Sequence, residues 1–107
     1  MSEISPKQFK ENWENGIKPF LLDVREPDEW EVCNLQAYGA VLIPLGEVPQ
    51  RLAEIPKGTP IVCQCRSGAR SARAQAFLKS NGYTDVTNLT GGILKWAADV
   101  DPSMPRY

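Results

Sequence analysis

Histidine is absent from all 107 residues of the chain. This absence excludes Ser-His-Asp triads, Cys-His nucleophile pairs and histidine metal sites. Cysteine is scarce, with an odd count of three at Cys33, Cys63 and Cys65. An odd count without an export signal argues against a disulfide framework, so we expect buried or reactive thiols. Any nucleophilic cysteine must therefore be activated without an imidazole.

Long apolar runs and an excess of either charge are also lacking. No segment approaches the roughly 18 apolar residues of a membrane span, and residues 1–10 lack the apolar core of a signal peptide. Twelve lysines and arginines against 13 aspartates and glutamates give a net charge of −1. This balance argues against a protein that binds nucleic acid or an anionic membrane through an excess of positive charge. We therefore expect a cytoplasmic protein with no nucleic-acid or membrane partner.

The rest of the composition is typical of globular proteins. Apolar residues make up 42% of the chain and charged residues 23%, which argues against disorder. The length corresponds to one domain, and no repeat or composition break divides it. The sequence therefore predicts a single domain over residues 1–107.

Nine prolines and eight glycines separate short segments of regular hydrophobic pattern. Ser5 is the expected N-cap of a first helix, Gln8 is expected to complete a capping box, and Asn15-Gly16 ends that helix. The later segments alternate between apolar runs and helical patterns. The expected strands are 20–24, 40–43, 60–64 and 86–89, and helical patterns start at Pro27, Val48 and Gly68 and after Gly91-Gly92. This alternation predicts an α/β fold, with an open parallel sheet and helices on both faces.

One loop at the carboxyl end of an expected strand carries reactive residues, and ligands bind at such ends in parallel sheets. Cys65 needs activation, because a free thiol is only about 3% ionised at neutral pH. A tight loop that enters a helix directs backbone N–H groups at one point, where the helix N-terminus adds positive potential. Arg66 and Arg70 add fixed positive charge, and an arginine can bind a sulfo or phosphate group through two hydrogen bonds. The hydroxyls of Ser67 and Ser71 are expected to donate hydrogen bonds to a thiolate or persulfide.

The loop also contains a glycine that supplies backbone freedom. The predicted catalytic residue is Cys65, and the predicted substrate-binding residues are Arg66, Ser67, Gly68, Ala69, Arg70 and Ser71. An alternative is that Cys65 ends a strand as a small apolar residue, with both arginines solvated. The combination of a strand, a cysteine, a glycine and two arginines before a helix favours the reactive interpretation.

The segment Cys-Arg-Ser-Gly-x-Arg-Ser at 65–71 resembles the active-site loop of the single-domain rhodaneses, which are thiosulfate-type sulfurtransferases. Three further segments match that family in order: residues 21–26, residues 43–47 and residues 88–96. The resemblance implies a parallel sheet of about five strands and a covalent persulfide at Cys65. It also implies ping-pong transfer of sulfur from a small anionic donor such as thiosulfate to a thiol, a protein acceptor or cyanide. We expect neither a cofactor nor a metal, because Cys63 and Cys65 are too few ligands for zinc.

Two alternatives remain beside this interpretation. Related phosphatases and arsenate reductases place five residues between cysteine and arginine, whereas four separate Cys65 from Arg70; the shorter loop favours a sulfur atom over a tetrahedral anion. The second alternative is a rhodanese-like module for sulfur relay or protein binding, with little turnover of its own. An intact Cys65, Gly68 and Arg70 argue against an inactive module but are compatible with a relay.

The sequence departs from the family pattern after the second expected helix. The family's Gly-His-Ile is replaced by Cys33-Asn34-Leu35, so no imidazole is available there. Cys33 is expected to pack as a small residue rather than to pair with Cys65.

Outside the loop, the charged residues are expected to have structural or solvent-facing roles. Asp23 and Arg25 are expected to brace loops through an ion pair or through hydrogen bonds to the backbone. The acidic residues of 26–31, including Glu29, are expected to form a solvated helix start. The tail at 101–107 is expected to be irregular.

Overall fold

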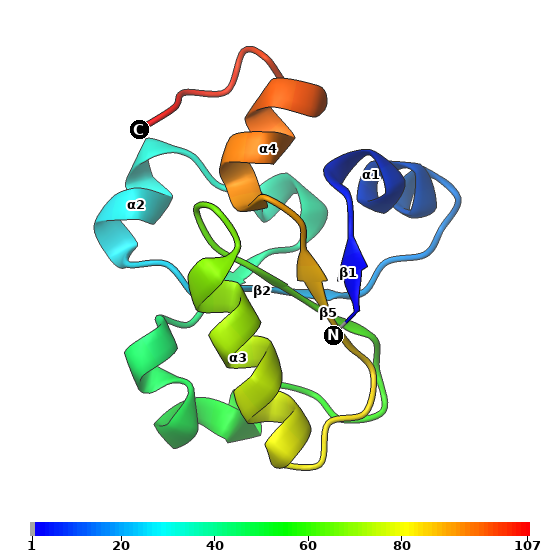
Figure 1. Cartoon of the computed structure of the whole chain (residues 1–107), viewed down its shortest axis with the longest axis vertical. Coiled ribbons are helices and arrows are strands. Elements are labelled where there is room, and N and C mark those ends of the chain that lie inside the picture. The colour runs from blue at the N-terminus through cyan, green and yellow to red at the C-terminus, as the bar shows by residue number, and fades with distance from the viewer. Residues whose placement is uncertain (1) are drawn as a thin grey trace.

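Apolar runs that stop at charged residues form the centre of a five-stranded parallel sheet in the computed structural model, which describes residues 2–107 (Figure 1). The strands are β1 (Glu3–Ile4), β2 (Phe20–Asp23), β3 (Val41–Leu42), β4 (Ile61–Gln64) and β5 (Val86–Leu89). Their order across the sheet is β1-β5-β4-β2-β3, and every neighbouring pair is parallel. The predicted α/β fold is confirmed, and β4 lies at the centre of the sheet.

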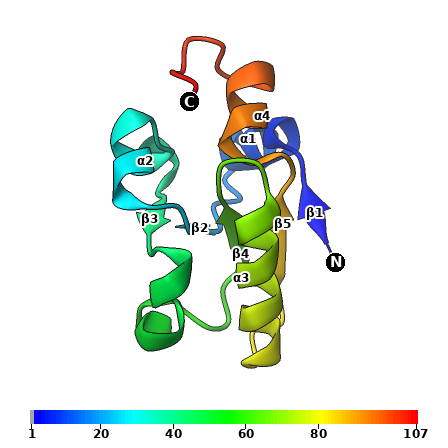
Figure 2. The same cartoon turned by 60° about the vertical axis from the view of Figure 1, so that its left-hand side comes forward.

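Helices cover both faces of this sheet, as predicted (Figure 2). They are α1 (Pro6–Glu14), α2 (Pro27–Val32), α3 (Ala69–Ser80) and α4 (Gly92–Asp99). One face packs against α3 and two 3₁₀ segments, Leu45–Glu47 and Pro49–Glu54, and the other packs against α1 and α4. Within residues 2–107, no helix has the length and apolar character needed to cross a membrane.

Alternation along the strands divides the buried side chains between the two faces. Cys63 on β4, and Cys65 just after its end, belong to the cluster beneath α3, whereas Val62 on β4 belongs to the cluster beneath α1 and α4. The second cluster centres on Trp96, whose ring centroid lies 5.7 Å from that of Phe9. Each face of the sheet thus has its own core, and the reactive loop emerges beside the α3 core.

Some sequence expectations differ from the structure. Strand β1 was not expected, because two residues carry no detectable periodicity. The helix expected from Val48 is a 3₁₀ segment, and Arg51 has non-helical angles inside it. Ser5 caps α1 by accepting the N–H of Gln8, but the Gln8 side chain donates to Asn12 instead of completing a capping box. Strand β1 adds an edge strand beside β5, and the other differences do not alter the sheet.

A buried ion pair braces the end of β2, as predicted. The Asp23 carboxylate accepts hydrogen bonds of 2.8–3.1 Å from the Arg25 guanidinium, and both side chains are fully buried. The guanidinium also donates to the main-chain oxygen of Cys33 at 2.8 Å. Burial lowers the pKa of Arg25, but the hydrogen bonds that it donates to Asp23 and Tyr107 outweigh burial and hold its pKa above the usual value. The pair fastens the loop after α2 to the sheet.

Replacing Asp23 with alanine should leave the Arg25 charge buried without its carboxylate partner. We expect the free energy of unfolding, measured by urea denaturation, to fall by about 3–5 kcal/mol. Glu14→Ala serves as the control, because it removes an exposed pair with Lys10 of a kind that contributes about 0.3–0.5 kcal/mol. Similar losses in both variants would contradict a bracing role for the buried pair.

Candidate active site

The loop at 65–71 lies where strands β2 and β4 end side by side. Asp23 and Gln64 are register partners in these parallel strands, and Cys65 follows Gln64 directly. The loop then turns at Gly68, which has a φ of +106°, and α3 begins at the next residue. This left-handed angle is one that side chains disfavour, which explains glycine at this position. The structure therefore places Cys65 at the carboxyl edge of the sheet.

Three hydrogen-bond donors surround the sulfur of Cys65. The N–H of Gly68 lies 3.1 Å from it, the N–H of Ser71 lies 3.4 Å from it, and the Ser71 hydroxyl oxygen lies 3.3 Å from it. The Ser71 N–H belongs to the first turn of α3, where N–H groups have no partner within the helix. Cys65 itself is 1% exposed. The arrangement is a small, largely covered cradle for a sulfur atom.

The two cysteines at the end of β4 have opposite acidities. Burial raises the pKa of the Cys65 thiol, but hydrogen bonds from the Ser71 hydroxyl and from the N–H groups of Ser71, Gly68 and Ser67 outweigh burial and hold that pKa below the usual value. Burial raises the pKa of Cys63 to about 12, with a smaller contribution from the nearby Cys65. Cys65 is therefore the more readily ionised of the two thiols.

Helix α4 holds the loop from the side away from the sulfur. The N–H of Ile93 donates to the main-chain oxygen of Cys65 at 2.9 Å, and the N–H of Leu94 donates to that of Arg66 at 3.1 Å. A Cβ at Gly92 would lie 2.5 Å from each of these two oxygens. Only glycine permits this approach, so the contact with the loop explains glycine at position 92.

Asn88 on β5 connects two parts of the loop and was not predicted as a site residue. Its Nδ2 donates to the main-chain oxygen of Gly68 at 3.0 Å, and its Oδ1 accepts from the Ser71 hydroxyl at 2.5 Å. The only sequence signal was its place in the C-terminal motif at 88–96. Its proximity to the loop depends on β5 pairing beside β4.

Glu29 corrects an expectation from the sequence. It was expected to be solvated at the start of α2, but its carboxylate forms a bidentate ion pair with Arg70, at 2.6 and 2.8 Å. The hydrogen bond from Arg70 is the main cause that lowers the pKa of Glu29 to about 2. The helix dipole also favours an acidic residue at the start of α2. The sequence therefore gave no reason to expect Glu29 to contact the loop.

The end of the tail lies near α2 (Figure 1), and its last residue contacts the same group of charged side chains. The Tyr107 hydroxyl accepts from Arg25 and donates to Glu29, each at 2.9 Å. The Arg66 guanidinium donates twice to the main-chain oxygen of Tyr107 and lies 5.0 Å from the centroid of its ring. Arg66 and Arg70 are therefore both engaged by residues of this chain.

The remaining predicted residues contribute little to the cradle through their side chains. Ser67 and Ala69 are exposed, and Ser67 acts through its main-chain N–H. Cys33 lies in the cluster beneath α1 and α4, on the opposite face of the sheet from Cys65. Asn34 donates to the Trp30 main-chain oxygen, so its contact is local. Within residues 2–107, no three His, Cys, Asp or Glu side chains are grouped as a metal site requires.

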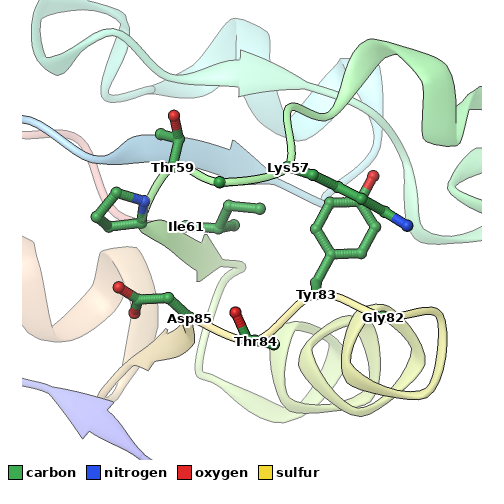
Figure 3. A pocket seen from close by; sticks show the side chains of 9 residues that line it. Lys57, Thr59, Ile61, Gly82, Tyr83, Thr84 and Asp85 are labelled. Carbon is green, nitrogen blue, oxygen red and sulfur yellow. The ribbon is translucent and has the colours of Figure 1, made fainter.

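A pocket of about 170 Å³ lies at the other end of the sheet, before β4 and β5 (Figure 3). Lys57 and Tyr83 line it, with the ammonium 5.0 Å from the ring centroid. The Tyr83 hydroxyl donates to the main-chain oxygen of Ile55 at 2.8 Å. Because it opens at the amino ends of the strands, this pocket is separate from the candidate active site.

Comparison with known families agrees with the four sequence motifs. The family model described as "Rhodanese-like domain" matches residues 5–99. The chain belongs to this family. A sulfurtransferase from Allochromatium vinosum is 37% identical over 97 residues, which cover 91% of this chain and 89% of that protein.

Longer proteins and solved structures match the same rhodanese-like domain. The probable adenylyltransferase/sulfurtransferase MoeZ of Mycobacterium tuberculosis is 37% identical over 108 residues, which cover 99% of this chain and 27% of that protein. The chain therefore spans about a quarter of the length of that relative. The crystal structure of a rhodanese-like domain protein from Staphylococcus aureus aligns with a TM-score of 0.85 at 26% identity, covering 100% of this chain and 99% of that one. These relatives support sulfur transfer as the general activity.

The Glu29–Arg70 pair predicts a specific dependence of stability on pH. Because the pKa of Glu29 is lowered in the folded chain from 4.5 to about 2, its contribution is complete above about pH 4.5 and is lost as the pH falls toward 2. Glu29→Gln should lower the free energy of unfolding near neutral pH by on the order of 1 kcal/mol, since Arg70 is partly exposed. The difference from the parent chain should shrink toward pH 2 in chemical denaturation. Glu31→Gln, on the same helix but exposed, should show no such convergence.

Gly92→Ala tests the contact between α4 and the loop. The φ of +61° and the overlap with the two loop oxygens should lower the free energy of unfolding by about 2 kcal/mol or more. The fraction of Cys65 thiolate, followed by its ultraviolet absorbance, should fall as the cradle is displaced. Gly46→Ala is the matched control, because a Cβ at Gly46 meets no atom within 4 Å. If the fraction of Cys65 thiolate is the same in Gly92→Ala as in the parent chain, the cradle does not depend on the contact with α4.

Proposed function

We propose that this rhodanese-like domain, residues 1–107, is a sulfurtransferase that carries a sulfane sulfur as a persulfide on Cys65. The observation that supports it best is the cradle of three donors around that sulfur. Such donors stabilise a negatively charged sulfur, in a thiolate or a persulfide anion, more than a neutral thiol. The lowered pKa of Cys65 agrees with a nucleophile that is activated without histidine.

In the first half of the reaction, the Cys65 thiolate attacks the outer sulfur of a small anionic donor such as thiosulfate. A sulfur–sulfur bond forms to Cys65, the sulfur–sulfur bond of the donor breaks, and sulfite leaves with that electron pair. The N–H groups of Gly68 and Ser71 are already oriented, so they need no rearrangement to stabilise the transferred sulfur.

The two loop arginines contribute differently to donor binding in this proposal. Arg70 is held by two hydrogen bonds from its guanidinium to Glu29, so it contributes positive potential more than a direct contact. Arg66 donates to the main-chain oxygen of Tyr107, which lies in the irregular tail outside the helices and strands. A small anion forms charge-assisted hydrogen bonds with a guanidinium and can take the place of this tail contact. Arg66 is therefore the proposed direct contact.

In the second half of the reaction, a thiolate acceptor attacks the outer sulfur of the persulfide, and cyanide replaces the thiolate in an assay. The new bond forms to the acceptor, and Cys65 leaves as a thiolate with the electron pair of the broken bond. A thiol of lower pKa leaves faster, so the cradle that activates Cys65 for attack also assists its departure.

A second candidate function is sulfur relay, in which a protein persulfide supplies the sulfur. The matching region of the Mycobacterium relative is 27% of a longer adenylyltransferase/sulfurtransferase, which is compatible with a relay. The 1% exposure of Cys65 makes the shape of the donor important in either case. A phosphatase or arsenate reductase is disfavoured, since only four residues separate Cys65 from Arg70.

The deciding experiment is the intact mass of the protein after brief treatment with thiosulfate. We expect the parent chain to gain one sulfur atom, and cyanide to remove it. Cys65→Ser should gain none, whereas Cys33→Ser should gain sulfur like the parent. No gain in the parent would refute thiosulfate as donor, and a protein persulfide donor would then be tested in the same way.

A further inference from the structure

The Ser71 hydroxyl has two hydrogen-bond acceptors within reach and carries a single proton. Its oxygen lies 2.5 Å from Oδ1 of Asn88 and 3.3 Å from the Cys65 sulfur. A serine hydroxyl donates one hydrogen bond at a time. The amide oxygen of Asn88 and an ionised Cys65 sulfur therefore compete for the same proton.

The orientation of the Asn88 amide follows from its second contact. Its Nδ2 donates to the main-chain oxygen of Gly68 at 3.0 Å, so its Oδ1 faces Ser71 as an acceptor. The reversed amide would set the Asn88 oxygen against the Gly68 oxygen, with no proton between them. The short contact with Asn88 thus requires Ser71 to be the donor, and the hydroxyl proton lies on the Asn88 side.

The hydrogen bond to the sulfur depends on the charge of the sulfur. A neutral Cys65 thiol donates its own proton to the Ser71 oxygen, which completes a chain from Cys65 through Ser71 to Asn88. A thiolate can only accept, so the Ser71 hydroxyl must turn away from Asn88 to reach it. That turn leaves Asn88 Oδ1 without its donor, and Asn88 is 5% exposed, so solvent compensates for little of the loss.

We propose that Asn88 is a positioning residue that withholds the Ser71 hydroxyl proton from the Cys65 sulfur in the resting site and releases it when the sulfur becomes negatively charged. The hydroxyl proton stays bonded to Ser71 throughout, and only the direction of its hydrogen bond changes. The catalytic meaning of this step rests on the proposed function. When an acceptor removes the outer sulfur, the departing Cys65 thiolate receives a donor that the same sulfur lacked while it was uncharged in the persulfide, which favours the transition state over the ground state.

Other contacts hold the loop when Asn88 is replaced. The Gly68 oxygen also accepts the N–H of Ala72 at 3.1 Å, and α4 holds the main-chain oxygens of Cys65 and Arg66. Arg70 from α3 and Cys63 from β4 are the ionisable groups that interact with Cys65, and every variant below retains both. The effect of removing the amide is therefore expected to pass through Ser71.

The test compares Asn88→Leu, Ser71→Ala and the double variant. The fraction of Cys65 thiolate is followed by ultraviolet absorbance against pH, with Cys65→Ser as the blank, and its alkylation by iodoacetamide is followed by peptide mass spectrometry. Asn88→Leu should lower the pKa of Cys65 by about one unit, a tenfold change in its ionisation constant. The limiting alkylation rate at high pH should fall about threefold, since nucleophilicity decreases with thiol pKa. In the Ser71→Ala background, the same substitution should leave the pKa of Cys65 unchanged.

A purely structural role for Asn88 predicts a different sign. Loosening of the cradle would raise the pKa of Cys65 or leave it unchanged, and either result would overturn the proposal, as would an equal shift without Ser71. Gln75→Leu is the matched control: Gln75 is a buried amide further along α3 that donates to the main-chain oxygens of Ser2 and Val86, and its loss should not shift the Cys65 pKa. If Asn88→Leu does not fold, Asn88→Ala removes the same amide with less bulk.

The alkylation test uses no sulfur donor, so it is independent of the proposed function. A chain that shows the shift but takes no sulfur from thiosulfate would support the role of Asn88 and contradict only the proposed donor. A chain that takes sulfur but shows no shift would overturn the role of Asn88 alone.

Discussion

The site depends on how the loop at 65–71 satisfies its own backbone. Its N–H groups must point inward to one sulfur, so its carbonyl oxygens must find partners on the outside, because buried main-chain groups cannot remain unpaired. The first turn of α4 supplies two of those partners, at the oxygens of Cys65 and Arg66, and Gln64 supplies another at 2.8 Å to the Cys65 oxygen. The position of the groups that surround the Cys65 sulfur thus depends on α4, which follows α3 and β5 in the chain.

The charged side chains near the loop are also connected to one another. The chain of contacts from Asp23 through Arg25, Tyr107 and Glu29 to Arg70 joins a fully buried ion pair to a partly exposed one. Each cation in it has an acceptor and each carboxylate has a donor, so the charges near the loop are fixed in position. This order has a cost for the proposed binding of an anionic donor, because Arg70 is already paired with Glu29, whereas the partner of Arg66 lies in the irregular tail.

Sequence reasoning was most successful where a signal was local. The runs at β2, β4 and β5 and the donor-rich loop were predictable because burial pattern, turn chemistry and helix capping act within a few residues. The structure gives the Gly68 and Ser71 N–H groups the expected direction, whereas the Ser67 side chain is exposed. Glu29, Asn88 and Tyr107 escaped prediction because their contacts exist only after the sheet and its tail are assembled. Strand β1 could not be predicted for the same reason: it is defined by its pairing with β5, and two residues show no hydrophobic pattern.

The distribution of the thiols bears on where a sulfur held at Cys65 can go. Cys33 is separated from Cys65 by the thickness of the sheet, and Cys63, although on the same face, is kept as a neutral thiol by a pKa of about 12. A persulfide is discharged by a thiolate that can reach its outer sulfur. In the proposed function, therefore, neither Cys33 nor Cys63 can take up the sulfur carried by Cys65. Its release would then require an encounter with the thiolate of a second molecule.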